Sequence, residues 1–183
     1  MRGDGPKART VAAIRRLADE AEEEDEVAIA GAESLAFANA GRAAAGVRGG
    51  EGHAPAETER LALHLHRLFS AVARGRPVPA ADLAALEEWA KRAALRRALV
   101  ETDEGFRWHR REEPDEQAAL WPIVDCAVAL LTGPWFRRIR ECAAAECGRL
   151  FVDRSKNGRR RWCRMAVCGN RHKARRFRGR GPF

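Results

Sequence analysis

Four cysteines near the carboxyl end are the residues whose type and spacing most clearly predict chemistry. Cys142 and Cys147 form one C-x4-C pair, Cys163 and Cys168 form a second, and fifteen residues separate the two pairs. Each pair can wrap a turn around one ion, and four thiolates complete a tetrahedral shell that suits Zn²⁺. Because a shell closed by four protein ligands leaves no position for a substrate water, the pattern predicts one structural zinc ion.

Buried or redox-active thiols are the first alternative to zinc, and an iron site is the second. The iron alternative is weaker because the cysteine spacing matches no common iron–sulfur pattern. A segment of about 40 residues has too little apolar surface to fold alone. Zinc binding supplies on the order of 10–16 kcal/mol in small finger peptides, so the composition favours zinc.

The basic residues gather in the same segment as the four cysteines. Residues 133–183 hold 16 Lys or Arg and 3 acidic residues, whereas residues 1–132 hold 18 and 23, and the whole chain carries +8. This asymmetry indicates an anionic partner such as nucleic acid. The alternative is a solvated helix whose arginines offset the zinc–thiolate charge, but two negative charges do not call for sixteen cations.

The sequence around the cysteine pairs predicts a small zinc finger. Residues 150–152 are expected to form a strand, residues 155–158 an Asn-Gly turn, and residues 160–163 the return strand. A helix is expected from residue 165 to about 178. The face of this helix expected to pack on the zinc site consists of Val167, Asn170, Ala174 and Phe177. The cations expected to contact nucleic acid are Arg159, Arg160, Arg161, Arg164, Arg171, Lys173, Arg175, Arg176 and Arg178.

The preceding part of the chain has the hydrophobic periodicity of a helical domain. An apolar stripe between Leu61 and Val72 predicts a helix over residues 56–72, and Pro79 or Asp82 can start the next helix. Residues 98–108 change to a period of two around a glycine turn, which predicts a hairpin. Pro114 can then open a helix that runs to residue 131.

The predicted fold is α+β and mainly helical. We expect an N-terminal helical domain with a small β-hairpin, and a treble-clef-like or ribbon-like zinc finger that ends in a basic helix. Residues 1–30 are expected to form an N-terminal helix and an acidic arm, residues 31–132 the helical domain, and residues 133–183 the finger with its basic tail. The longest apolar stretch, near residues 123–131, is too short to span a bilayer, so we expect no membrane partner.

Composition also predicts the compartment and argues against catalysis. The fifth cysteine, Cys126, lies alone in a helical pattern and is expected to be a small buried hydrophobe. Because the first residues show no signal-peptide pattern, we expect a cytoplasmic protein with reduced thiols. We find no phosphate loop, nucleophile elbow or zinc-protease motif, and expect no enzyme. A nuclease would need an open second metal site, with His109 and His172 as its only candidates.

The stretch WCRMAVCGNRHKAR at residues 162–175 closely resembles the CGNR zinc finger family, whose name is the tetrapeptide at residues 168–171. The upstream cysteine pair and LFVDRS at residues 150–155 match the same pattern. This resemblance implies a zinc-binding nucleic-acid module with the four cysteines as ligands. Residues 61–94 look like the ABATE domain that usually precedes this finger, a domain of proposed stress-induced bacterial transcription regulators. Residues 34–39 stand where that domain has its opening strand.

These observations predict a bacterial transcriptional regulator that binds DNA through a four-cysteine zinc finger. Its N-terminal domain is expected to sense a small-molecule effector or to form a homodimer that places two fingers on one site. The alternative is an RNA-binding or ribosome-associated zinc module, in which Trp162 and Phe177 could stack on bases. A redox switch, in which oxidation of the thiolates ejects zinc, is a variant of the first function.

Overall fold

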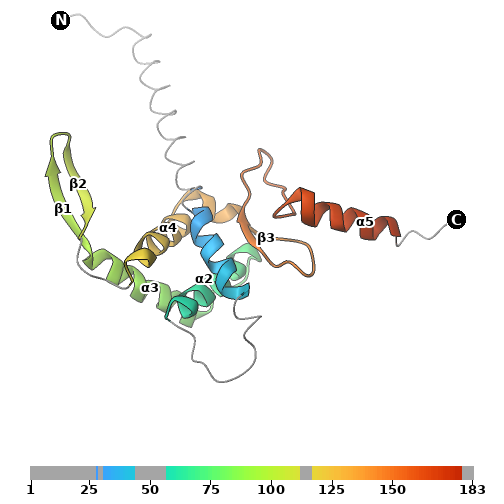
Figure 1. Cartoon of the computed structure of the whole chain (residues 1–183), viewed down its shortest axis with the longest axis horizontal. Coiled ribbons are helices and arrows are strands. Elements are labelled where there is room, and N and C mark those ends of the chain that lie inside the picture. The colour runs from blue at the N-terminus through green and yellow to red at the C-terminus, as the bar shows by residue number, and fades with distance from the viewer. Residues whose placement is uncertain (1–27, 29–30, 44–56, 112–116, 179–183) are drawn as a thin grey trace, which may run out of the picture.

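The computed structural model of the chain describes residues 28, 31–43, 57–111 and 117–178. A helix over residues 31–43 is followed by further elements in chain order (Figure 1). They are α2 (Glu57–Ala73), α3 (Ala80–Leu95), β1 (Arg97–Thr102), β2 (Gly105–Arg110), η1 (Ala118–Leu120), α4 (Trp121–Thr132), η2 (Pro134–Arg138), β3 (Ile139–Glu141), β4 (Leu150–Val152), η3 (Met165–Gly169) and α5 (Asn170–Arg178). The predicted fold class, mainly helical with a zinc finger that ends in a helix, is confirmed.

One hydrophobic core lies among four helices: the helix over residues 31–43, α2, α3 and α4. The stripe predicted on α2 is confirmed, since Leu61 and Leu65 are fully buried and Leu68 is 1 % exposed. Trp89 on α3 and Trp121 on α4 contact each other, with ring centroids 5.5 Å apart. Leu83 on α3 is 53 % exposed, because it lies beside the buried stripe of this helix. None of the described helices is both long and apolar enough to cross a membrane.

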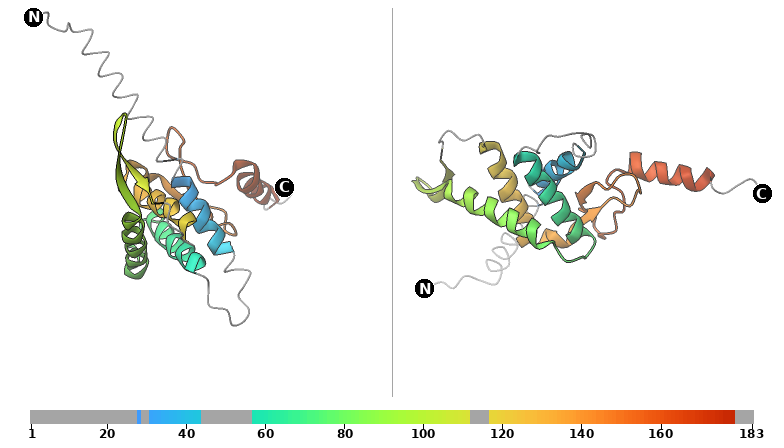
Figure 2. Two further views of the ribbon diagram at one scale, coloured as in Figure 1. Left: turned by 60° about the vertical axis from the view of Figure 1, so that its left-hand side comes forward. Right: turned by 90° about the horizontal axis from the view of Figure 1, so that it is seen from below.

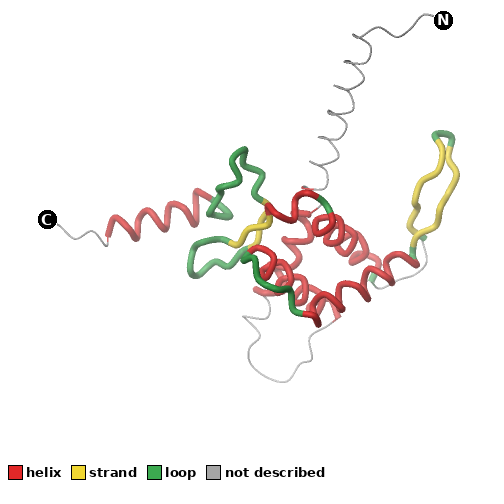
Figure 3. Tube along the Cα trace, turned by 180° about the vertical axis from the view of Figure 1, so that it is seen from behind, coloured by secondary structure: helices red, strands yellow, loops and turns green. Residues whose placement is uncertain are grey.

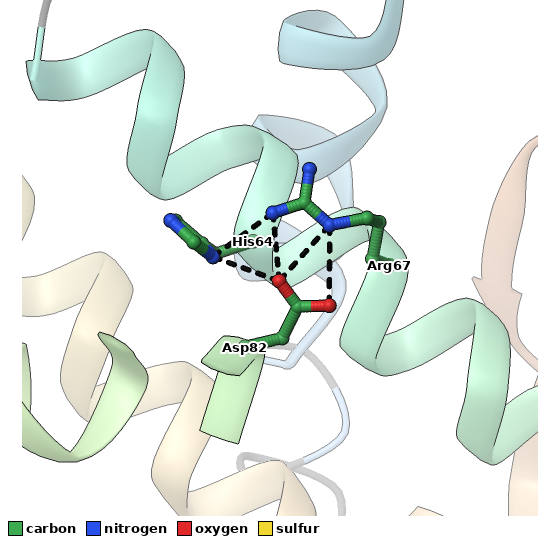
Figure 4. Close-up of polar contacts among 3 residues, drawn as sticks. All are labelled: His64, Arg67 and Asp82. Atoms are coloured by element: carbon green, nitrogen blue, oxygen red, sulfur yellow. Dashed lines mark hydrogen bonds and ion pairs between the residues drawn. The ribbon is translucent and has the colours of Figure 1, made fainter. Parts of the chain in front are cut away.

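A buried carboxylate joins α2 to α3. Asp82 lies in the first turn of α3, and its side chain is 2 % exposed. Its Oδ1 atom lies 2.7 Å from Nη2 of Arg67 and 2.8 Å from Nδ1 of His64, both on α2 (Figure 4). Burial alone would raise the pKa of this carboxyl, but the hydrogen bonds with Arg67 and His64 outweigh burial and lower it. The cluster therefore ties the start of α3 to α2.

Three expectations about element boundaries need correction or fall outside the described residues. Residues 34–39 form a helix and not an opening strand, because Leu35 and Ala38 pack at helical spacing against the core. The helix expected from Pro114 begins at Trp121 after the short η1 turn, and Pro122 occupies its first turn. Pro114 itself and, apart from Ala28, the expected N-terminal helix and acidic arm lie outside the described residues.

The predicted hairpin is confirmed as β1 and β2, which pair antiparallel with Leu99 opposite Trp108. It stands away from the helices at the end of the molecule opposite α5 (Figures 1 and 3). Its root is tied to α4, because the carboxylate oxygens of Asp125 each lie 2.5 Å from a guanidinium nitrogen of Arg97 or Arg110. The rest of the hairpin is left largely in solvent.

A second ribbon, β3 paired with β4, joins the finger to the helical core. Ile139, Leu150 and Val152 of this ribbon belong to the same hydrophobic cluster as α2 and α4. The strand predicted at residues 150–152 is confirmed, but its predicted partner at residues 160–163 is wrong, since β4 pairs with β3. The Arg160 N–H donates instead to the Asp153 carboxylate at 2.9 Å, so this N–H takes no part in a β-ladder.

Candidate metal centre

The four predicted ligands meet at one place in the folded chain. Their sulfur atoms all lie within 4.8 Å of one another, and Cys163 Sγ lies 3.7 Å from both Cys147 Sγ and Cys168 Sγ. A tetrahedron with Zn–S bonds of about 2.3 Å places its sulfurs roughly 3.8 Å apart, which matches this spacing. All five cysteines of the chain are free thiols. The cluster therefore has the size and chemistry of a closed zinc shell.

Backbone turns hold each cysteine pair in this arrangement. In the first pair, Cys147 N–H donates to Ala144 O at 2.9 Å, and the next residue, Gly148, has a φ of +57° that favours glycine. In the second pair, Cys168 N–H donates to Arg164 O at 2.9 Å. Each C-x4-C segment thus closes as a turn around the sulfurs, as its spacing predicts.

Two side chains of the loop between the pairs brace the second pair. Asp153 is fully buried, and besides the Arg160 N–H it accepts a hydrogen bond from Ser155 N–H at 3.0 Å. Arg160 turns its guanidinium toward the second pair, where Nε donates to Trp162 O at 2.9 Å and Nη2 donates to Cys163 O. The same guanidinium lies 4.9 Å from the Phe151 ring centroid. Asp153 and Arg160 therefore position the ligand Cys163.

The electrostatics of the cluster favour a bound cation. Burial opposes ionisation of Cys142, but hydrogen bonds with the Cys163 and Ala144 backbones outweigh it and lower the pKa of this thiol. Burial and the neighbouring thiols raise the pKa of Cys163 to about 12, and burial raises the pKa of Cys168. Thiolates this close repel one another, and a divalent cation removes that repulsion.

Comparison with known proteins places this metal centre in a family. Residues 138–181 match the CGNR zinc finger, and residues 9–134 match ABATE, described as "Putative stress-induced transcription regulator". The chain belongs to the ABATE family. It carries its CGNR finger directly after that domain, in the order that the sequence resemblance implies. Among curated proteins, none matches the chain. Together with the sulfur geometry, the CGNR match assigns one structural zinc ion to the four cysteines.

The nine cations predicted to contact nucleic acid all lie on the exposed surface of the CGNR finger. Two of them are engaged within the finger: Arg160, as described above, and Arg175, whose Nη2 lies 2.8 Å from Glu146 Oε1. Arg161 lies over the ring of Trp162, with its guanidinium carbon 5.3 Å from the ring centroid. The other six are Arg159, Arg164, Arg171, Lys173, Arg176 and Arg178.

No residue of the final helix is buried, which corrects one expectation. Val167 is 45 % exposed and Phe177 is 81 % exposed, and α5 has no buried residue over Asn170–Arg178. The predicted packing of this face on the zinc site is therefore wrong. Instead, Trp162 packs beside the cysteines and stacks on His172, with ring centroids 4.8 Å apart. Figure 2 shows α5 extending away from the ABATE helices.

The ABATE domain contributes residues to the finger that the sequence did not indicate. Asn39 Nδ2 donates to Leu150 O at 3.0 Å, and Leu150 N–H donates back to Asn39 Oδ1 at 2.9 Å. Arg42 Nη2 donates to Cys147 O at 2.5 Å, directly at a zinc ligand. Because 105 or more residues separate these partners, periodicity and local spacing carry no signal of them.

Further contacts join the finger to α2 and to Arg74, the residue that follows this helix. Glu141 on β3 accepts hydrogen bonds from Arg74 Nε and from Ser70 Oγ, each at 2.7 Å. A cavity of about 280 Å³ also opens between the helix over residues 31–43 and the finger. It is lined by zinc-ligand cysteines and by Arg42, Arg149, Arg164 and Arg171, among others. The finger is thus docked on the ABATE domain. The charged side chains that line the cavity between them are mostly basic.

Proposed function

We propose that this chain is a DNA-binding transcriptional regulator, in which the CGNR finger grips DNA and the ABATE domain controls it. The observation that carries the proposal is a set of exposed cations held beside a closed zinc shell. A zinc ion bound by four thiolates carries two negative charges. Two cations would offset them, and the finger presents many more. The surplus positive charge fits a polyanion.

The proposed contact surface, called the basic surface below, consists of Arg159, Arg161, Arg164, Arg171, Lys173, Arg176 and Arg178. Within the described residues, no hydrogen bond or ion pair engages these seven side chains, so their donors are available to phosphate oxygens. Arg160 and Arg175 are left out because the finger already engages them. We assign these two arginines to contacts within the finger.

The shape of the finger supports duplex DNA as the polyanion. Helix α5 stands away from the body and has no buried residue, so it presents an exposed face of the kind that can enter a major groove. One observation favours the alternative, an RNA-binding or ribosome-associated module: Phe177 is 81 % exposed and could stack on an unpaired base. Competition between a duplex DNA and a structured RNA of equal length for the same protein separates the two functions.

The ABATE domain supplies regulation in this proposal. It senses a small-molecule effector or pairs two chains, and its contacts with β3 and β4 pass the change to the finger. No catalytic role is proposed, because four protein sulfurs leave the zinc ion no position for a substrate water. A DNA-binding protein with reduced thiolates is suited to the bacterial cytoplasm, which we propose as its location.

The salt dependence of DNA affinity tests the proposal. Each phosphate contact on duplex DNA contributes about −0.9 to the slope of log affinity against log salt, so seven contacts predict a slope of about −6. The double variant R171A/R178A should make that slope shallower by about 1.8. The control R60A/R76A removes the same charge from exposed positions on the ABATE domain and should leave the slope unchanged. Equal slopes for the two double variants would refute the basic surface as the contact site.

A further inference from the structure

The β1–β2 hairpin exposes large apolar side chains far from the finger. Leu99 is 58 % exposed, Phe106 is 71 % exposed and Trp108 is 65 % exposed. A two-stranded hairpin in water is at best marginally stable, and among the described residues the ion pairs that tie this one to the body lie at its root. Side chains of this kind are characteristic of protein interfaces.

The strand register places these residues on one face. Side chains alternate between faces along a strand, so Leu99 and its partner Trp108 share a face with the next pair toward the turn, Glu101 and Phe106. The pair toward the root on the same face is Arg97 and Arg110. This face, called the hairpin face below, therefore has a basic root, an apolar centre and an acidic position near its tip.

That order of charges is complementary to itself. Consider a two-fold axis that lies between two hairpin faces, perpendicular to the strands and level with the Leu99–Trp108 pair. It would stack the two apolar centres on each other with the hairpins antiparallel. Glu101 of each copy would then lie opposite the arginine pair at the root of the other. Among the described residues, the two root arginines share one carboxylate, Asp125, and the Arg97 side chain is 36 % exposed. One positive charge at each root is therefore left for Glu101 of the second copy.

We propose that the hairpin face is a homodimer interface whose partner is a second copy of this chain. The inference rests on the proposed function, since a regulator with one finger gains specificity by placing two on one site. The hairpin and α5 lie at opposite ends of the molecule (Figures 1 and 3). Pairing through the hairpin leaves both basic surfaces uncovered.

Sedimentation velocity on the full chain, with DNA binding measured in parallel, tests the interface. The wild type should be a dimer at concentrations of about 100 μM and above and should dissociate on dilution, as expected for a small interface. W108S and L99S should each raise the dimer dissociation constant at least about tenfold, as loss of a central anchor does. E101R, which keeps every apolar side chain, should weaken the dimer because it places arginine opposite arginine. The control L83S removes a similarly exposed leucine from α3 and should leave the dimer intact.

The outcomes separate the interface from the proposed function. A monomeric wild type, or a dimer that W108S, L99S and E101R leave unchanged, would overturn the interface whatever the DNA result. A dimer that these variants disrupt and L83S does not would support the interface, even if no variant or wild type bound DNA. Circular dichroism of each variant shows whether the helical body is retained, so a loss of dimer cannot be mistaken for unfolding.

Discussion

Replacing Asn39 with alanine should weaken the docking of the zinc finger on the ABATE domain. The side chain makes two hydrogen bonds with the backbone of Leu150, one in each direction, at 3.0 and 2.9 Å. Leu150 is 2 % exposed, so its N–H and C=O groups would lose their partners in a buried place. The contact therefore links the helix over residues 31–43 directly to strand β4.

The magnitude of this loss follows from the geometry. Two hydrogen bonds are worth about 1 kcal/mol each, and unpaired buried groups add to that loss. Alanine has a helix propensity better than asparagine by about 0.6 kcal/mol, which offsets part of the loss. The free energy of unfolding should fall by about 2 kcal/mol, equivalent to about 4–8 °C in Tm for a chain of this size.

Thermal unfolding followed by circular dichroism measures the change, with N170A as the matched control. Asn170 makes one exposed hydrogen bond, from Nδ2 to Ala166 O at 3.2 Å, so its removal should lower Tm by less than about 2 °C. If N39A and N170A melted together, the docking of the finger on the ABATE domain would be refuted.

Two further predictions concern the packing and the charge of the ABATE helices. A Cβ atom at Gly41 would lie 2.2 Å from Ala62 Cβ on α2, so G41A should destabilise the protein by about 1–3 kcal/mol in urea unfolding, and a wild-type midpoint would contradict this packing. D82N should lower the free energy of unfolding at neutral pH. Because Arg67 and His64 lower the pKa of Asp82 in the folded state, the contribution of this carboxylate is complete above its unfolded pKa of about 3.9 and is lost as pH falls through the folded value. The difference between wild type and D82N should therefore shrink between pH 5 and pH 3, and a constant difference would contradict the charge-based account.

The zinc centre and the main helices could be predicted from the sequence because their signals are local. A C-x4-C pair spans one turn, and the stripe on α2 repeats within 17 residues, so short-range spacing is enough. The Asn-Gly turn is also local and is confirmed, with Gly158 at a φ of +62°. In these regions the local preference of the chain and its tertiary packing agree.

The features that could not be predicted depend on distant contacts. Strand β4 pairs with β3 because Ile139, Leu150 and Val152 are buried against α2, which local turn propensity does not encode. The role of Arg42 at a zinc ligand likewise requires the folded ABATE domain. The amphipathic pattern of the last helix predicts a packed Phe177, but periodicity cannot show that nothing among the described residues covers that face.

The most direct test of the account is DNA affinity measured as a function of zinc content in the same sample. Zinc is withdrawn stepwise with a chelator, while native mass spectrometry counts the bound metal and fluorescence anisotropy reports duplex binding. We predict one zinc ion per chain and a bound DNA fraction that falls in proportion to zinc loss, because the four sulfurs hold the basic surface in place. Reduced, metal-free chain that bound the duplex with unchanged affinity and unchanged salt slope would contradict the account.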